Sequence, residues 1–369
     1  MRYRPLGRSG LMVSELSLGS WTTLGGSIGS DASAPIVRRA FDLGINLFDT
    51  ADVYVKGAAE EALGVAIREL PRGEIVVATK CMGRVWEGPM GRGLSRKHMF
   101  DALDASLRRL KLDYVDLYQF HAPDDDTPIE ESLRALEDLV RSGRVRYVGF
   151  SNFDHQPPLA AKAVAIQARE RYLPFISSQP RYSLLDRHVE QGHTAFCKQH
   201  GIGMIVYSPL SQGVLTNKYA AGARPEGSRA TGTFAHFLDS QKALTPETVA
   251  AAERLGTWCA ARGWSAAAVA LAWVLQNAQV SSAIIGATRI DQLEENVKAL
   301  DVTLTAAEWR EVAALTNLAP AAKAKAGGAK KAAPKQAAPK PAAPRKPAAP
   351  RKPAPKQSAA KQPAKPKRR

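Results

Sequence analysis

Residues 46–64, NLFDTADVYVKGAAEEALG, show the unit from which the fold is built. An apolar run ends at Asp49, which places this carboxylate where a strand gives way to a loop. Tyr54 lies within the loop, and Glu60 and Glu61 open the helix that follows. Loops held by rigid elements carry functional side chains, so we expect Asp49 and Tyr54 to face a cleft.

The same strand–loop–helix unit recurs along the chain. Eight β-rich runs are expected: LSLGSW (16–21), NLFDT (46–50), IVVATK (75–80), VDLYQFH (115–121), VRYVGFS (145–151), ISSQPRY (176–182), GMIVYSP (203–209) and SSAIIGA (281–287). Amphipathic helices are expected between them, among others over 95–110, 128–141 and 265–276. Thr127 before Pro128 predicts an N-cap followed by proline at the first helical position.

Eight such units in about 300 residues predict an α/β fold, a (β/α)8 TIM barrel. A doubly wound sheet is the alternative that the same alternation allows. The nucleotide-binding pattern GxGxxG is missing after the first run, and residues 1–13, MRYRPLGRSGLMV, are typical of a β-hairpin that caps the barrel floor. We therefore assign residues 1–318 to the barrel.

Residues 319–369 are predicted to form a disordered basic tail. From residue 320 onward lie 16 of the 51 Lys and Arg residues and no acid, so the other 35 basic residues balance the 35 acidic ones. Frequent proline and the absence of aromatic and β-branched residues exclude a helix or a core. Such a tail would bind DNA, RNA or another polyanion with strong salt dependence. A solubilising extension or contact with an acidic membrane or polyphosphate are the alternatives.

The sequence predicts a cytoplasmic protein that does not insert into membranes. It begins without the apolar run of a signal peptide and contains no stretch of 18 apolar residues. Its three cysteines, Cys81, Cys197 and Cys259, are too few and too scattered for a disulfide framework.

Four ionisable side chains are expected to converge at the C-terminal ends of neighbouring barrel strands. Asp49 and Tyr54 follow the second run, Lys80 ends the third and His121 ends the fourth. Lys80, held by Asp49, would lower the pKa of the Tyr54 hydroxyl. Tyr54 would then donate a proton to a carbonyl oxygen, to which His121 also hydrogen-bonds. The set predicts carbonyl reduction by a hydride donor without a metal.

Seven motifs in order, FDTADVY, VVATK, LYQFH, GFSNF, SQPRYSLLDR, YSPLSQGVL and IIGATRIDQLEENVKAL, are similar to those of the aldo-keto reductase superfamily. The resemblance covers residues 3 to about 318. The pieces YRPLGRSGLMVSELSLG, GRGLSRKH, SPLSQGVLTNKY and GATRIDQLEEN most resemble the branch of voltage-gated potassium channel β-subunits and their bacterial relatives. Some of those β-subunits lack the histidine that corresponds to His121, so its presence here favours catalytic turnover.

The resemblance implies that NADPH or NADP⁺ binds across the barrel mouth. By position, it implies cofactor contacts from Trp21, Ser151, Asn152, Gln179, Tyr207, Ser208, Leu210, Gln212, Gly213, Lys218, Arg229, Gly286, Thr288, Arg289, Gln292, Glu295 and Asn296. Thr288 and Arg289 also precede a helix expected from about Asp291, where a helix N-terminus and a guanidinium favour the 2′-phosphate. Pairing of Arg289 with Asp291 or Glu294 is the alternative.

The substrate is a small carbonyl compound of unassigned identity. The resemblance places Trp21, Met82 and Trp86 in the substrate pocket. Met82 and Trp86 lie in the long loop after the third run, so an exposed or loop-packing role is the alternative for them.

Other patterns imitate sites. His193, Cys197 and His200 share one face of an expected helix, with His188 just before it, but ligands on a single helix seldom complete a zinc shell, and we expect no metal. Cys81 could be a redox-sensing thiolate because Lys80 is its neighbour, but strand alternation favours a packed thiol that points away. Trp258, Trp264 and Trp273 are expected to pack in the core.

Two functions remain open at this point. The first is an NADPH-dependent aldo-keto reductase with Asp49, Tyr54, Lys80 and His121 as catalytic residues. The second is a redox-sensing NADPH-binding regulatory subunit, tied to a channel or, through the tail, to nucleic acid. The family's channel β-subunits form tetramers, which makes a homo-oligomer the expected assembly.

Overall fold

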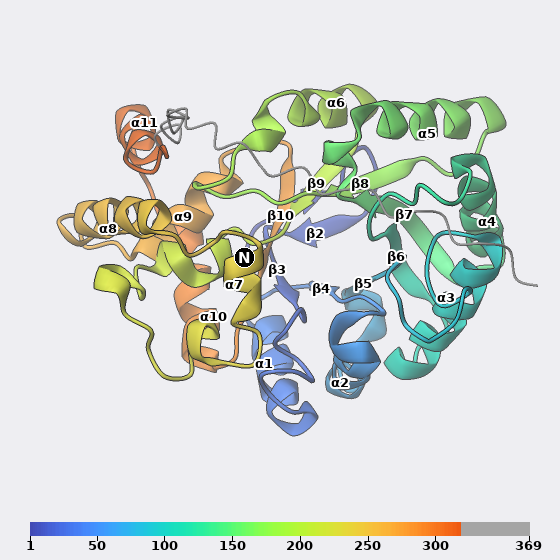
Figure 1. Ribbon diagram of the computed structural model, residues 1–369, viewed down its shortest axis with the longest axis horizontal. Helices are drawn as coiled ribbons and strands as arrows, with labels where there is room; N and C mark the ends of the chain where they lie inside the picture. Colours follow the sequence, from blue (N-terminus) through green and yellow to red (C-terminus); the bar gives the residue numbers. More distant parts are fainter. Residues whose placement is uncertain (319–369) are drawn as a thin grey trace, which may run out of the picture. The chain divides into compact units, whose positions relative to one another are not determined.

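The computed structural model describes residues 1–318, and the predicted tail lies outside them. Eight parallel strands form a closed barrel in the order β10–β3–β4–β5–β6–β7–β8–β9 (Figure 1). These strands are β3 (Leu16–Gly19), β4 (Leu47–Asp49), β5 (Val76–Cys81), β6 (Val115–Phe120), β7 (Val145–Ser151), β8 (Phe175–Gln179), β9 (Gly203–Val206) and β10 (Val280–Ile285). All eight predicted runs are confirmed, and the TIM barrel is correct.

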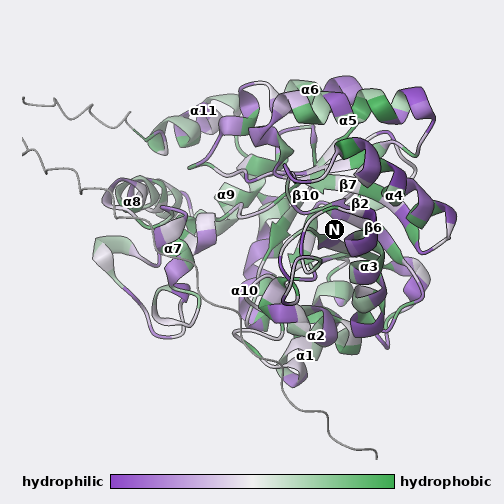
Figure 2. Cartoon of the chain, turned by 45° about the vertical axis from the view of Figure 1, so that its right-hand side comes forward, coloured by the Kyte–Doolittle hydropathy of each residue, from purple (hydrophilic) through white to green (hydrophobic). Residues whose placement is uncertain are grey.

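Helices surround the barrel in Figure 1. They are α1 (Ser30–Asp42), α2 (Ala58–Ala66), α3 (Arg96–Leu110), α4 (Ile129–Arg141), α5 (Pro157–Glu170), α6 (His193–His200), α7 (His236–Ser240), α8 (Pro246–Ala260), α9 (Ala266–Leu275), α10 (Ile290–Val297) and α11 (Ala306–Leu315). In Figure 2, α4 carries both hydrophilic and hydrophobic residues, and its buried side chains include Ile129, Leu133 and Leu136. One apolar stripe is therefore what attaches this helix to the sheet.

The ends of the predicted helices are set by local capping. Ser95 and Ser265 accept hydrogen bonds from the backbone amides of His98 and Ala268, which fixes the N-termini of α3 and α9. The predicted cap at Thr127 is wrong by one residue. Pro128 is itself the N-cap, because its extended backbone (ψ 127°) starts the helix only at the next residue.

A hairpin closes the bottom of the barrel, as predicted. Strands β1 (Tyr3–Pro5) and β2 (Met12–Ser14) pair antiparallel. Leu6 and Val13 are fully buried in a cluster with Leu47, Leu117 and other side chains of the barrel strands. Apolar side chains therefore pack the floor, and the strand ends that would carry a functional site lie at the opposite end of the barrel.

Candidate active site

Lys80 is the centre of the charged group at the strand ends. Its ammonium nitrogen lies 2.7 Å from Oδ1 of Asp49, 2.7 Å from the carbonyl oxygen of Thr50 and 3.3 Å from the hydroxyl of Tyr54. The Lys80 side chain is completely buried, and Asp49 is nearly so. Three neighbours thus use the three N–H donors of the ammonium, which fixes its position below the tyrosine.

The buried charges determine the protonation of Tyr54. Burial is the largest single effect and lowers the pKa of Lys80, but Asp49 and Tyr54 together outweigh it and raise the pKa, so Lys80 is a cation. Burial raises the pKa of Tyr54 more than Lys80 lowers it. Lys80 lowers the pKa of Tyr54 as predicted, but burial, the larger effect, leaves the pKa above its usual value. Tyr54 is protonated, as a proton donor must be, and Lys80 still reduces the cost of forming its phenolate.

His121 faces the ring of Tyr54 from the end of β6. The two ring centroids are 5.5 Å apart in an edge-on arrangement. Burial, and secondly the Lys80 charge, lowers the pKa of His121 to about 3, so its imidazole is neutral. A neutral imidazole can donate one hydrogen bond to a substrate oxygen without supplying a competing acid.

Polar side chains from β7 to β9 continue this group. Gln179 donates from Nε2 to Oδ2 of Asp49 at 2.8 Å, and the Ser151 hydroxyl donates to the Gln179 carbonyl at 2.7 Å. Asn152 donates to the His121 carbonyl at 2.8 Å and accepts from the Tyr207 hydroxyl at 2.9 Å. Four residues predicted to contact the cofactor, Ser151, Asn152, Gln179 and Tyr207, are thereby joined to the four predicted catalytic residues.

A cavity of about 1120 Å³ opens above these residues. Asp49, Tyr54 and His121 line one part of it. All the residues predicted to contact the cofactor line it as well: Trp21, Ser151, Asn152, Gln179, Tyr207, Ser208, Leu210, Gln212, Gly213, Lys218, Arg229, Gly286, Thr288, Arg289, Gln292, Glu295 and Asn296. The structure therefore brings the predicted set onto one continuous wall.

Positive charge gathers in the part of the cavity lined by Lys218 and Arg229. Burial lowers the pKa of both side chains, and the pKa of Lys218 is lowered further by Arg229 and Arg289. Within residues 1–318, neither Lys218 nor Arg229 pairs with a carboxylate; Arg229 instead donates to Gln212 at 3.0 Å and Thr22 at 2.6 Å. Partly buried cations without anionic partners suit the phosphates of a dinucleotide.

Arg289 has the surface partner that the sequence left as the alternative. Its guanidinium donates to both carboxylate oxygens of Asp291 at 2.9 Å, with both side chains largely exposed. An exposed pair of this kind is worth about 0–1 kcal/mol, so a phosphate can compete with it. Thr288 is held at the start of α10 by its backbone amide, which donates to Gln292 at 2.9 Å.

The three residues predicted for the substrate pocket lie in different places. Trp21 lines the cavity, packs on Phe237 with centroids 4.8 Å apart, and carries the Arg229 guanidinium over its ring. Met82 and Trp86 are not on the cavity wall, so the structure does not support their assignment. Trp86 packs on His98, with centroids 5.0 Å apart, and Met82 packs against the core.

The sequence did not reveal two aromatic residues that line the same cavity. Phe234 and Phe237 line the cavity from residues 231–241, beyond β9. The segment that leads to them contains short turns with left-handed backbone at Ser211 (φ 47°), Gln212 (φ 56°) and Asn217 (φ 63°). Such turns show no periodic spacing of hydrophobic residues. The only signal in the sequence was the presence of aromatic residues within a polar stretch.

Comparison with known proteins agrees with this geometry. Residues 15–317 match the sequence model of the Aldo/keto reductase family. The chain belongs to the aldo/keto reductase family. It is 40% identical over 308 residues to a probable voltage-gated potassium channel subunit beta of Oryza sativa, covering 82% of this chain and 92% of that protein.

Two other relatives show a similar degree of identity. The chain is 40% identical over 309 residues to the L-glyceraldehyde 3-phosphate reductase of Escherichia coli, covering 82% of this chain and 88% of the relative. It is 41% identical over 308 residues to a probable potassium channel subunit beta of Arabidopsis thaliana, with 82% and 92% covered. The resemblance to the channel β-subunit branch is confirmed, and family membership supports an oxidoreductase acting on carbonyl compounds.

The histidines and cysteines that resembled a zinc site or a redox sensor in the sequence have structural roles. His193 Nε2 lies 2.8 Å from the Ser178 hydroxyl and 3.4 Å from the Cys197 sulfur, whereas His200 packs on Phe196. Cys81 is fully buried, and burial raises the pKa of its thiol, so it is the packed thiol that strand alternation favoured.

Two sequence expectations away from the cavity can also be compared with the structure. Trp258, Trp264 and Trp273 pack in one apolar cluster, as predicted. Within residues 1–318, none of the helices combines the length and apolar character that a membrane crossing needs.

Proposed function

We propose that the protein reduces aldehydes and ketones to alcohols with NADPH, and that Tyr54 is the general acid. The observation that carries the proposal is the Tyr54 hydroxyl 3.3 Å from the buried Lys80 ammonium, beside a cavity that Lys218 and Arg229 also line. The residues fit the cofactor: Asn152, Gln179 and Tyr207 would hold the nicotinamide end, and Lys218 and Arg229 the phosphates. When bound, NADPH supplies the hydride that reduces the carbonyl carbon.

The protein's own residues supply the proton and the orientation. The substrate oxygen would accept hydrogen bonds from the Tyr54 hydroxyl and from the neutral imidazole of His121. As negative charge develops on that oxygen, the proton moves to it from Tyr54. Lys80 stabilises the resulting phenolate, and Asp49 compensates the buried charge of Lys80. Trp21 and Phe237 exclude water from one side of the cavity.

Tyr54→Phe tests the proposed acid. Purified full-length protein is mixed with NADPH and 4-nitrobenzaldehyde, and NADPH absorbance is followed in a stopped-flow instrument. The rate of the reduction step should fall by about 10²–10⁴-fold, the usual contribution of a general acid. NADPH affinity, measured by fluorescence titration, should stay unchanged. Tyr114→Phe, which precedes β6 at the opposite end of the barrel, is the matched control. Wild-type rates in Tyr54→Phe would refute the assignment.

A second candidate is a regulatory subunit that senses the redox state of bound NADPH. It is favoured by the similarity to proteins named as potassium channel β-subunits. The stopped-flow experiment separates the two functions. Oxidation that continues beyond one equivalent of NADPH establishes an enzyme, whereas oxidation that stops at one equivalent with NADP⁺ retained favours the sensor.

Four further predictions accompany this proposal. Cytoplasmic location and a homo-oligomer are predicted from the sequence and the family resemblance. Polyanion binding is assigned to residues 320–369, outside the described residues, and the division at residue 318 is likewise a proposal.

A further inference from the structure

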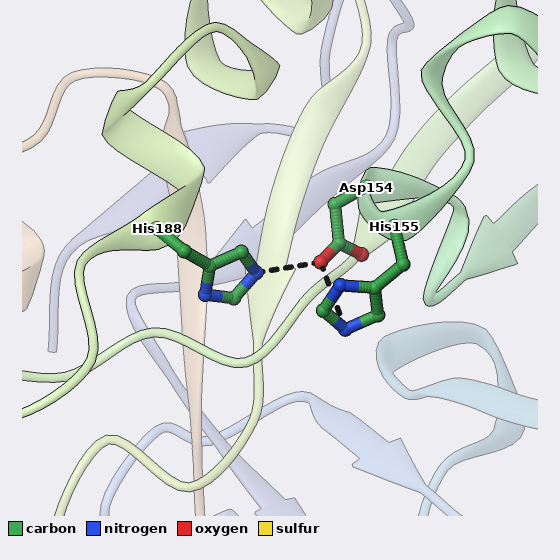
Figure 3. A group of neighbouring side chains, drawn as sticks. All are labelled: Asp154, His155 and His188. Atoms are coloured by element: carbon green, nitrogen blue, oxygen red, sulfur yellow. Dashed lines mark hydrogen bonds and ion pairs between the residues drawn. The ribbon is translucent and has the colours of Figure 1, made fainter. Parts of the chain in front are cut away.

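A second polar cluster lies in the loops after β7 and β8, outside the residues that line the large cavity. Figure 3 shows Asp154, His155 and His188 turned toward one another, with His188 arriving from a separate segment. His188 Nε2 lies 2.6 Å from Oδ2 of Asp154, and His155 Nε2 lies 3.5 Å from the same oxygen. One potential ligand atom from each of the three residues lies within 4.8 Å of the others.

Asp154 has coordinating capacity that the protein leaves unused. Its side chain is 1% exposed, and within residues 1–318 its Oδ1 has no hydrogen-bond partner. A buried carboxylate oxygen without a partner is unfavourable. A small cavity of about 90 Å³, lined by Asp154, His188 and His193 among others but not by His155, adjoins the Asp154 side chain and has room for a water molecule.

A second carboxylate fixes the orientation of His188. Oδ1 of Asp186 lies 2.6 Å from Nδ1 of His188, so the imidazole donates there and turns Nε2 toward Asp154. Metal-binding histidines typically have this outer carboxylate, which fixes the tautomer and the ring. Asp186 is itself held by Arg181 at 2.5 Å.

We propose that Asp154, His155 and His188 form a binding site for Zn²⁺, with Asp186 as the outer carboxylate and water in the remaining position. One carboxylate and two imidazoles are ligands that zinc accepts, and three protein ligands plus water complete its tetrahedral shell. Binding replaces the proton between His188 Nε2 and Asp154 by the metal, and that proton is released to solvent. The 2.6 Å separation of His188 Nε2 and Asp154 Oδ2 must widen to roughly 3.4 Å, because tetrahedral zinc lies about 2.0–2.2 Å from each ligand.

This site differs from the single-helix pattern that the sequence suggested, and it departs from the expectation of no metal. Its ligands come from two loops that also carry Asn152 and Arg181, so zinc would connect the two loops. The tail adds no competing ligands, because residues 320–369 contain no His, Cys, Asp or Glu.

Isothermal titration calorimetry of untagged, EDTA-treated full-length protein with ZnCl₂ tests the proposal. We expect one zinc per chain. His155→Gln should weaken binding at least tenfold, and since His155 is largely exposed, its replacement leaves the fold intact. Asp186→Asn should weaken binding by about 10–100-fold at unchanged stoichiometry, as outer-shell changes do. His200→Gln, outside the cluster, should bind zinc like the wild type.

Two results would overturn the proposal. The first is that no zinc binding is detected when the ZnCl₂ concentration is 100 times the protein concentration. The second is unchanged affinity in both His155→Gln and the double variant His155→Gln/His188→Gln, which would place any bound zinc elsewhere. The outcome is independent of the reductase proposal, because zinc binding is measured without NADPH or substrate.

Discussion

Lys80→Met should destabilise the protein strongly, because it leaves the Asp49 carboxylate buried without its cation. The pair is 2.7 Å apart, with 0% and 4% of the two side chains exposed. Removing one partner of such a buried pair costs about 3–5 kcal/mol of the free energy of unfolding. Gln179 still donates to Asp49 at 2.8 Å, but a neutral amide does not replace a charge. The Thr50 carbonyl also loses its donor.

The assay is a double-mutant cycle by urea unfolding at pH 7 without cofactor. Asp49→Asn alone should cost a similar amount, since it strands the Lys80 cation. The double variant Lys80→Met/Asp49→Asn removes both charges, so it should cost clearly less than the sum of the two single changes. Lys97→Met, from the exposed Lys97–Asp101 pair, is the control and should cost less than about 1 kcal/mol. If the free-energy costs of the two single changes add up to that of the double variant within about 0.5 kcal/mol, Lys80 and Asp49 do not act as a unit.

Three further predictions test the cofactor site, a buried acid and the tail. Arg289→Ala should weaken NADPH binding about 10–100-fold, the value of one charge-assisted hydrogen bond, while NADH binding changes little; equal losses would remove the 2′-phosphate assignment. Asp52 is buried with no partner for its carboxylate within residues 1–318, and burial, then Glu60, raises its pKa well above the usual value. Its proton is therefore retained on folding, and stability falls as the pH rises above about 3.9. In Asp52→Asn the melting temperature should fall less steeply with rising pH than in the wild type. An Asp52→Asn variant that is less stable than the wild type at pH 8 would contradict this prediction. Deleting residues 320–369 should leave reduction kinetics unchanged and abolish DNA retention at about 50 mM salt, and the tether fails if full-length protein ignores DNA.

The sequence was sufficient for the barrel because each strand has its own local signature. Short apolar runs that end in polar residues mark strand ends, and the closed topology then brings those ends together. Asp49, Lys80 and His121 could therefore be grouped before any contact was known. The helix start at Ile129 could not be predicted to the residue, since it depends on the backbone angle of Pro128.

The remaining parts of the site depend on contacts that leave no local pattern. Trp86 packs on His98 because the loop after β5 folds back onto α3, which composition does not indicate. Phe234 and Phe237 reach the cavity through irregular turns. His188 contacts Asp154, which is 34 positions earlier in the chain, and the helical spacing around His188 pointed to other partners. Long-range contacts between loops are where sequence reasoning failed.

The pKa of Tyr54 shows why the site needs its ligands to be understood. Burial raises the pKa of Tyr54 despite the opposing charge of Lys80, so Tyr54 holds its proton firmly. In the proposed reaction, the reduced carbonyl oxygen would be a much stronger base than the phenolate, so the proton would leave Tyr54 only as negative charge develops on that oxygen. A firmly held proton would thus be transferred to the substrate and not lost to water. Lys80 would stabilise the phenolate that remains, and for that role its buried pair with Asp49 would have to persist throughout the proposed reaction.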